Sequence, residues 1–92
     1  MKIQYAIQIK GEVQGVGFRF WLKQRARDLD LVGFVRNQDN GNVYTLVQGS
    51  KEDLDDYLDS CGEGPELAKV KKVKYEESEI DEILESFEIM QH

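Results

Sequence analysis

The sequence predicts an α+β fold in which two helices cover one face of an antiparallel sheet. Apolar residues alternate with polar or small ones along residues 3–10, which is the pattern of a half-buried strand. Two later stretches, residues 18–29 and 54–61, carry apolar residues at helical spacing. Between these stretches, Asn40-Gly41 separates two apolar runs and is typical of a hairpin turn.

The first half of the chain supplies four elements. The first strand is marked by four alternating apolar residues, Ile3, Tyr5, Ile7 and Ile9. A helix that begins near Phe18 or Arg19 is predicted from one apolar stripe, made of Phe18, Leu22, Ala26 and Leu29. Residues 31–38 and 43–47 are then predicted as the two strands of the hairpin.

The second half supplies three more elements. Ser50-Lys51-Glu52-Asp53 resembles a capping box, with Asp in place of the usual Glu or Gln, and predicts the start of a helix. Gly62 and Gly64 are expected to close that helix. A strand is indicated by Val70, Val73 and Tyr75, and a short last strand by Phe87 and Ile89.

The order of these elements is β-α-β-β-α-β with a short C-terminal strand, which is the ferredoxin-like α/β sandwich. Because the first crossover should be right-handed, we expect the second hairpin strand to pair between the first strand and its hairpin partner. A chain of 92 residues with 40% hydrophobic content can build one small core, so we expect a single domain over residues 1–92.

The segment before the first helix has the features of an anion-binding loop. Gly11, Gly15 and Gly17 let the backbone turn tightly and bring its N–H groups close to a bound group. The helix that follows adds unpaired N–H groups and the positive end of its dipole. Arg19 adds a planar donor fork that suits phosphate oxygens. These features predict a pocket for a small phosphate-bearing ligand, although neither a Walker loop nor a dinucleotide-binding fingerprint is present.

The residues of this segment, Val13-Gln14-Gly15-Val16-Gly17-Phe18-Arg19, resemble the signature loop of the acylphosphatase family. The likeness continues through Gly33-Phe34-Val35-Arg36-Asn37 and Asn40-Gly41-Asn42-Val43 and extends to Phe87-Glu88-Ile89. It therefore covers essentially the whole chain, and it also implies the ferredoxin-like fold.

The resemblance implies hydrolysis of the carboxyl–phosphate bond of small acyl phosphates to a carboxylate and inorganic phosphate. The phosphoryl oxygens would be bound by the loop residues Gln14, Gly15, Val16, Gly17, Phe18 and Arg19. Arg19 and Asn37 would be the catalytic residues, with Asn37 positioning the attacking water. Because neighbouring strand residues point to opposite faces, Arg36 and Asn37 should not both reach the loop, and the resemblance selects Asn37.

The residue types agree with this chemistry. The leaving carboxylate is the conjugate base of an acid with a pKa of about 4, so it can depart without a general acid. Phosphoryl transfer asks a protein mainly for positioning and charge stabilisation. Cys61 is expected to be a partly buried thiol, and the one histidine, His92, is the last residue. We therefore expect attack by water without a covalent intermediate, and neither a metal nor a cofactor.

Three positions depart from the family pattern, which usually has Gly, Trp and Asp where this chain has Asp30, Phe34 and Asn40. If position 30 ends the helix in a left-handed conformation, Asp should cost about 1 kcal/mol of stability relative to Gly. None of the three residues touches the expected chemistry.

The charge pattern limits the partners. A net charge of −6 argues against general affinity for nucleic acid or anionic membranes. Residues 1–46 hold seven Lys and Arg against four Asp and Glu, whereas residues 47–92 hold five against fourteen. Phosphate or sulfate should therefore bind in the first half. With no signal-peptide core and no apolar run of about 20 residues, we expect a cytoplasmic protein. Nothing in the sequence marks an oligomer interface, so we expect a monomer.

Three other functions fit parts of the pattern. An RNA-recognition module of similar fold would need aromatic residues in a basic motif on its third strand, where residues 43–49 offer only Tyr44. A non-catalytic module could use the same loop to sense phosphate or carboxylate. An acylphosphatase-like domain also begins larger carbamoyl-transfer maturation proteins.

Overall fold

The computed structural model describes residues 1–91, so His92 lies outside the described part of the chain. All seven predicted elements are present in the predicted order. They are β1 (Ile3–Glu12), α1 (Phe18–Asp28), β2 (Val32–Asn37), β3 (Val43–Gly49), α2 (Lys51–Glu63), β4 (Lys69–Ser78) and β5 (Phe87–Met90). Neither helix is long and apolar enough to cross a membrane, within residues 1–91.

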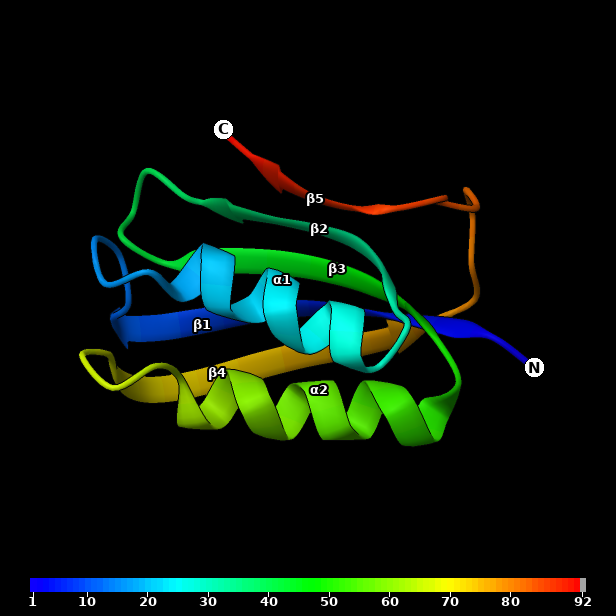
Figure 1. Cartoon of the computed structure of the whole chain (residues 1–92), viewed down its shortest axis with the longest axis horizontal. Coiled ribbons are helices and arrows are strands. Elements are labelled where there is room, and N and C mark those ends of the chain that lie inside the picture. Colours follow the sequence, from blue (N-terminus) through cyan, green and yellow to red (C-terminus); the bar gives the residue numbers. More distant parts are fainter. Residues whose placement is uncertain (92) are drawn as a thin grey trace.

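The five strands form one sheet in the order β4-β1-β3-β2-β5 (Figure 1). The hairpin strand β3 lies between β1 and β2, as the handedness rule predicts. The last strand, β5, pairs in parallel with β2, so the sheet is mixed and not antiparallel throughout. The reason is that β4 runs antiparallel to β2. The chain reverses its direction after β4, so β5 runs in the same direction as β2 when it reaches the free edge of that strand.

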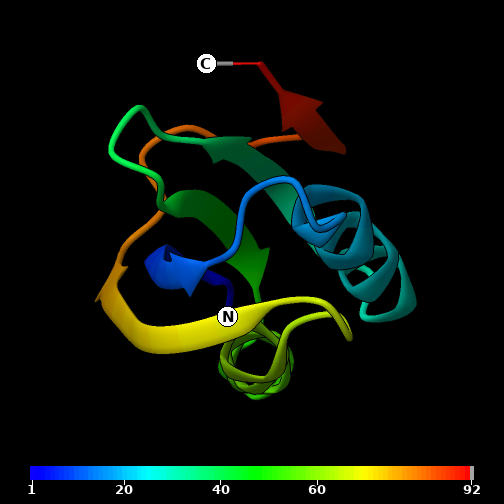
Figure 2. The same cartoon turned by 90° about the vertical axis from the view of Figure 1, so that its left-hand side faces the viewer.

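Both helices pack on the same face of the sheet, and the opposite face carries neither helix (Figure 2). The alternation in β1 turns Tyr5, Ile7 and Ile9 toward the helices, where all three are fully buried. The helices bury their predicted stripes against them: Phe18, Leu22 and Ala26 from α1, and Leu54, Tyr57 and Cys61 from α2. The core therefore lies between the sheet and the two helices, as the periodicity predicts.

The end of α1 has the predicted left-handed residue. Asp30 has a φ of 59° and is the one residue other than glycine with a positive φ among residues 1–91. The Asp30 N–H donates to the carbonyl of Arg27 at 3.1 Å, and the Leu31 N–H donates to the carbonyl of Ala26 at 2.8 Å. These two bonds form a Schellman motif, in which the left-handed position usually belongs to glycine.

The caps of α2 follow the sequence with one difference. At the start, the Asp53 N–H donates to the Ser50 side-chain oxygen at 3.3 Å, as the capping-box pattern predicts. At the end, Gly64 is the C-cap residue with a φ of 71°. Gly62, which was expected to help close the helix, lies within its last turn.

The β2–β3 connection is longer than the predicted two-residue turn. The Gln38 N–H donates to the Asn42 carbonyl at 2.8 Å, and the Gly41 N–H donates to the Gln38 carbonyl at 3.1 Å. Residues 39–41 therefore lie beyond the closing pair, and Gly41 has a φ of 93°. A type I′ turn needs a positive φ at both central residues, and Asn40 does not adopt one. Instead, the Asn40 side-chain oxygen accepts a hydrogen bond from the Asn42 N–H at 3.0 Å.

Candidate active site

The segment between β1 and α1, residues 13–17, is called here the glycine loop. Val13 is 1% exposed and anchors the start of the loop in the core. Gly15 and Gly17 both lie in the left-handed region, with φ of 75° and 79°. A Cβ at either position would meet no atom within 4 Å, so the left-handed conformation and not lack of space favours glycine there.

The glycine loop ends at the start of α1, where Gly17 is the N-cap residue and no side chain caps the helix. The first turn of α1 contains no acidic residue. The free N–H groups and the positive end of the helix dipole are therefore available to an anion. This arrangement agrees with the predicted anion-binding loop.

A hollow of about 180 Å³ lies over this helix start, and we call it the loop hollow. Its lining comes from the loop, α1, β2 and β5, and consists of Val13, Gly15, Gly17, Phe18, Arg19, Phe20, Asn37 and Ile89. Arg19 and Asn37 are 18 positions apart in the sequence and share this one hollow. A hollow of this volume is well above the roughly 10–15 Å³ that one water needs on the same measure, so it can hold a small ligand.

Arg19 is half-buried and makes few contacts with the rest of the protein. Its Nη1 donates to the Met90 carbonyl at 3.5 Å, which is long for a hydrogen bond. Within residues 1–91, no carboxylate lies within 4.0 Å of its guanidinium. Most of the donors of Arg19 are therefore free to bind an oxyanion.

Asn37 is the last residue of β2 and pairs with Val43 in the ladder. Its side chain is half-buried and forms no hydrogen bond with any residue from 1 to 91. Arg36 occupies the opposite face, where its guanidinium lies 5.1 Å from the centre of the Tyr44 ring. The expected separation of Arg36 from Asn37 is confirmed, and the free amide of Asn37 can bind a water in the loop hollow.

The loop residues expected to bind phosphate are not all placed alike. Gly15, Gly17, Phe18 and Arg19 line the loop hollow, whereas Gln14 and Val16 do not. The Gln14 side chain turns toward the hairpin, where its Nε2 donates to the carbonyls of Gln38 and Asn42 at 2.8 Å each.

Three apolar residues of the lining, Val13, Phe20 and Ile89, were not predicted as site residues, although Val13 begins the recognised loop segment. Phe20 is 63% exposed at the mouth of the loop hollow, and Ile89 enters it from β5. Phe20 falls outside the buried stripe of α1. An aromatic residue at such a solvent-exposed position, beside Arg19, could have been identified from the sequence as a candidate site residue. Ile89 carried no such signal, because its position depends on β5 pairing with β2.

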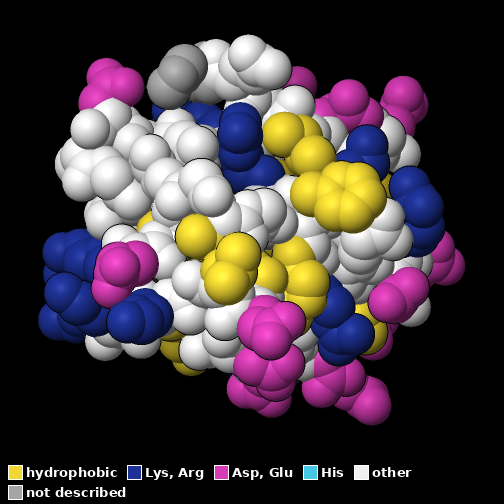
Figure 3. Space-filling model, turned by 60° about the vertical axis from the view of Figure 1, so that its left-hand side comes forward, with side chains coloured by type: hydrophobic (Ala, Val, Ile, Leu, Met, Phe, Trp, Pro, Cys, Tyr) yellow, Lys and Arg dark blue, Asp and Glu magenta, His cyan; other side chains and the backbone are white. Residues whose placement is uncertain are grey.

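Elsewhere in residues 1–91, the single cysteine does not provide a second reactive site. Cys61 is fully buried in α2, and burial raises the pKa of its thiol, so it is not a nucleophile. Within residues 1–91, no group of three or more His, Cys, Asp or Glu could hold a metal ion. Figure 3 shows the end of the molecule that carries the glycine loop, where Lys or Arg side chains lie beside hydrophobic ones and acidic side chains gather along the lower edge.

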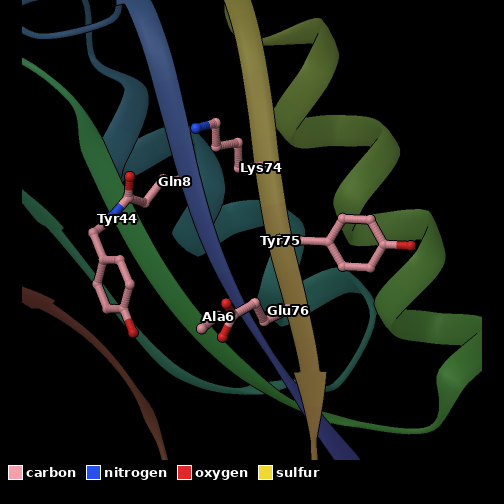
Figure 4. Close-up of a pocket in the computed structure, with 6 residues that line it drawn as sticks. All are labelled: Ala6, Gln8, Tyr44, Lys74, Tyr75 and Glu76. Atoms are coloured by element: carbon pink, nitrogen blue, oxygen red, sulfur yellow. The ribbon is translucent and has the colours of Figure 1, made fainter.

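A larger hollow, of about 680 Å³, lies on the sheet face that the helices leave open. It is lined by Ala6, Gln8, Tyr44, Lys74, Tyr75 and Glu76. In Figure 4 the Tyr75 side chain points away from the others, toward α2, and its ring packs 5.0 Å from that of Tyr5. This hollow holds neither Arg19 nor Asn37, so the loop hollow is the better candidate for an active site.

The chain is similar to known proteins in both sequence and fold. The family model described as Acylphosphatase matches residues 5–89. The chain is 45% identical to an acylphosphatase of Shewanella amazonensis, over 92% of this chain and 93% of that protein. The crystal structure of acylphosphatase from Bacillus subtilis matches with a TM-score of 0.93 and 34% identity, over 96% of this chain and 98% of that chain. The crystal structure of T. kodakarensis HypF matches with a TM-score of 0.85 and 27% identity, over 100% of this chain but 12% of that chain.

Proposed function

The chain belongs to the acylphosphatase family, whose members are hydrolases, and we propose that its own reaction takes place in the loop hollow. The reaction is the hydrolysis of the carboxyl–phosphate bond of small acyl phosphates. The observation that carries this proposal is that Arg19, at the start of α1, and Asn37, at the end of β2, line the same hollow.

The phosphoryl group binds at the glycine loop. Its oxygens accept hydrogen bonds from the N–H groups of the loop and of the first turn of α1, and from the Arg19 guanidinium. The dipole of α1 and the charge of Arg19 both stabilise the negative charge on these oxygens. The absence of a carboxylate near Arg19 within residues 1–91 supports this role, because no internal partner competes with the ligand.

The attacking water binds to Asn37. The amide oxygen of Asn37 accepts one hydrogen bond from the water and turns the water's lone pair toward phosphorus. As the new P–O bond forms, the bond to the acyl oxygen breaks in line with it, and its electron pair leaves with the carboxylate. The surplus proton of the water passes to a phosphoryl oxygen or to solvent, so no side chain has to act as a base. The acyl group then lies toward the apolar side of the hollow, formed by Phe20 and Ile89.

Direct attack by water, without a covalent intermediate, is supported by the lining of the loop hollow. None of its eight residues carries a hydroxyl, thiol, imidazole, amine or carboxyl group. The chemistry therefore depends on positioning and on fixed charges, which are the two requirements of phosphoryl transfer.

The test is to incubate the protein with acetyl phosphate and with an aromatic acyl phosphate in ¹⁸O-labelled water. We expect carboxylate and phosphate to be released in equal amounts, with the label in phosphate. Label in the carboxylate would place the attack at carbon and overturn the mechanism. Binding of phosphate without any turnover would favour the phosphate-sensing module instead.

The proposal also covers the anions that compete with the substrate and the oligomeric state and location of the protein. Inorganic phosphate or sulfate should compete with substrate, since either anion resembles the phosphoryl group. We further propose that residues 1–92 form a single domain that works as a cytoplasmic monomer. Size-exclusion chromatography with light scattering at several concentrations tests the monomeric state.

A further inference from the structure

Gln14 joins the glycine loop to the β2–β3 hairpin. Both N–H bonds of its side-chain amide are used, one to the carbonyl of Gln38 and one to the carbonyl of Asn42, at 2.8 Å each. We call these two hydrogen bonds the Gln14 bridge. The two acceptor residues are themselves paired, because the Gln38 N–H donates to the Asn42 carbonyl at 2.8 Å.

The Gln14 bridge ends directly beside Asn37. Gln38 follows Asn37 in the chain, and Asn42 precedes Val43, the ladder partner of Asn37. Asn37 and Val43 form the last pair of the β2–β3 ladder. The bridge therefore holds the hairpin at the two residues just beyond the pair that contains the proposed water-binding side chain.

No ladder bond fixes the glycine loop to this end of β2. The loop continues from β1, and β3 lies between β1 and β2 in the sheet. The chain connection from α1 to β2 runs through Asp30 and Leu31, at the far end of both elements from the loop hollow. The Gln14 bridge thus joins the glycine loop by hydrogen bonds to the hairpin that begins at the end of β2.

We propose that Gln14 is a positioning residue, which holds Asn37 at the place from which it aims the attacking water at the phosphoryl group. The Gln14 side chain does not line the loop hollow, so it acts through the hairpin and not by contact with the phosphoryl oxygens. This inference rests on the proposed function. Its physical basis is that small displacements of a reacting group cost much rate, about 100-fold for a misplacement of about 1 Å.

The substitution that tests the bridge is Gln14→Met, which keeps an unbranched side chain of similar length and removes both donors. We expect kcat for acetyl phosphate to fall by about tenfold, which corresponds to about 1.4 kcal/mol. The inhibition constant of inorganic phosphate should change by less than about twofold, because the phosphate contacts are kept. An unchanged kcat, or a loss of phosphate affinity equal to the loss of kcat, would overturn the proposal.

A matched control is Gln48→Met, because Gln48 makes a similar bridge at the opposite end of β3. Its Nε2 donates to the side-chain oxygen of Gln4 at 3.1 Å and to the carbonyl of Glu82 at 2.6 Å. Loss of this bridge should lower Tm and leave kcat unchanged. If Gln48→Met lowers kcat as much as Gln14→Met does, the effect is one of general stability and the proposal fails.

A double variant tests whether Gln14 acts through Asn37. In the Asn37→Ala background, Gln14→Met should cause no further loss of kcat, because the residue that it positions is absent. If the fold losses of kcat from the two substitutions multiply in the double variant, Gln14 acts independently of Asn37, and the proposal would be overturned.

Amide hydrogen exchange separates failure of this proposal from failure of the proposed function. Gln14→Met should speed the exchange of the Gln38 N–H, which closes the hairpin beside Asn37. If the parent protein hydrolyses acyl phosphates and this exchange does not change, the bridge is unimportant and only the present inference fails. If the parent shows no turnover, the proposed function fails whatever the exchange rates are.

Discussion

Within residues 1–91, the Arg19 side chain makes one hydrogen bond, a long one from Nη1 to the Met90 carbonyl at 3.5 Å. Its role should therefore depend on the shape of its donor fork, which a lysine cannot reproduce. We predict that Arg19→Lys and Arg19→Ala both lose most activity while the fold survives. The measurements are kcat/KM and thermal unfolding, where a tenfold loss of kcat/KM equals about 1.4 kcal/mol of transition-state stabilisation.

Arg36 provides the control for that experiment. It lies 17 positions further along the chain, over the ring of Tyr44 on the opposite face of β2. Arg36→Lys should leave kcat/KM close to that of the parent. A value for Arg19→Lys within about threefold of the parent would show that the fork is not used, and the role of Arg19 would have to be abandoned.

Asp30 is a residue-scale source of instability. It adopts a φ of 59° in the Schellman motif and forms no salt bridge within residues 1–91. Its carboxylate also lies at the negative end of the α1 dipole. We predict that Asp30→Gly stabilises the protein by about 1 kcal/mol, which is a rise in Tm of about 4–8 °C for a domain of this size.

Asp30→Asn separates the effect of the carboxylate charge from the effect of the left-handed backbone, because it removes the charge and keeps a Cβ in the left-handed region. Its stability should lie between those of the parent and Asp30→Gly. A Tm for Asp30→Gly equal to or below the parent value would mean that Asp30 makes a compensating interaction.

At the scale of elements, the site depends on the start of α1 and the end of β2 lying at the same end of the sheet. In the proposed mechanism, Arg19 and the helix start bind the phosphoryl group before and during the reaction, whereas Asn37 at the end of β2 binds only the water. We predict that Asn37→Ala lowers kcat by about 10²- to 10³-fold, comparable to the loss of one oxyanion-hole donor. The inhibition constant of phosphate should stay nearly unchanged.

Arg19→Ala is the comparison variant, because it should lose phosphate affinity as well as kcat, whereas Asn37→Ala should lose kcat alone. Neither an arginine nor an asparagine side chain changes its charge near neutral pH in proteins. The parent's kcat should therefore be nearly flat between about pH 6.5 and 8.5. Full kcat in Asn37→Ala, or a loss of phosphate affinity as large as that of Arg19→Ala, would assign Asn37 to structure or binding.

At the scale of the whole molecule, two places carry enough positive charge to attract an anion, one in each half of the chain. One is the glycine loop, and the other is the exposed lysine-rich start of β4, with Lys69, Lys71, Lys72 and Lys74. We predict that phosphate binds at the loop, because backbone N–H groups and the α1 dipole converge there. In an NMR titration, the N–H signals of residues 14–19 should move most.

Salt distinguishes the two places in the same experiment. Exposed lysines lose most of their attraction at high ionic strength, whereas hydrogen bonds in a hollow are screened less. The shifts at residues 14–19 should persist when the salt concentration is raised. Shifts centred on residues 69–74 that fade with salt would reject the loop as the phosphate site.

The sequence by itself determined the seven elements and their order, because strands and helices differ in the period of their apolar residues. The turn at Asp30 and the cap at Ser50 were also readable, since each depends on a few neighbouring residues and their hydrogen bonds. The glycine loop with Arg19 was recognisable for the same reason, as its backbone requirement is local.

The tertiary structure alone decided the features that join distant parts of the chain. The parallel pairing of β5, and with it the place of Ile89, depends on which edge of the sheet the chain reaches after β4. The three-residue hairpin loop was not distinguishable from a two-residue turn, because Asn40-Gly41 is compatible with both. The contact of the Gln14 side chain with the hairpin was not predicted, since its acceptors are 24 and 28 positions away. Local periodicity carries no information about contacts of that length, which arise only when the core packs.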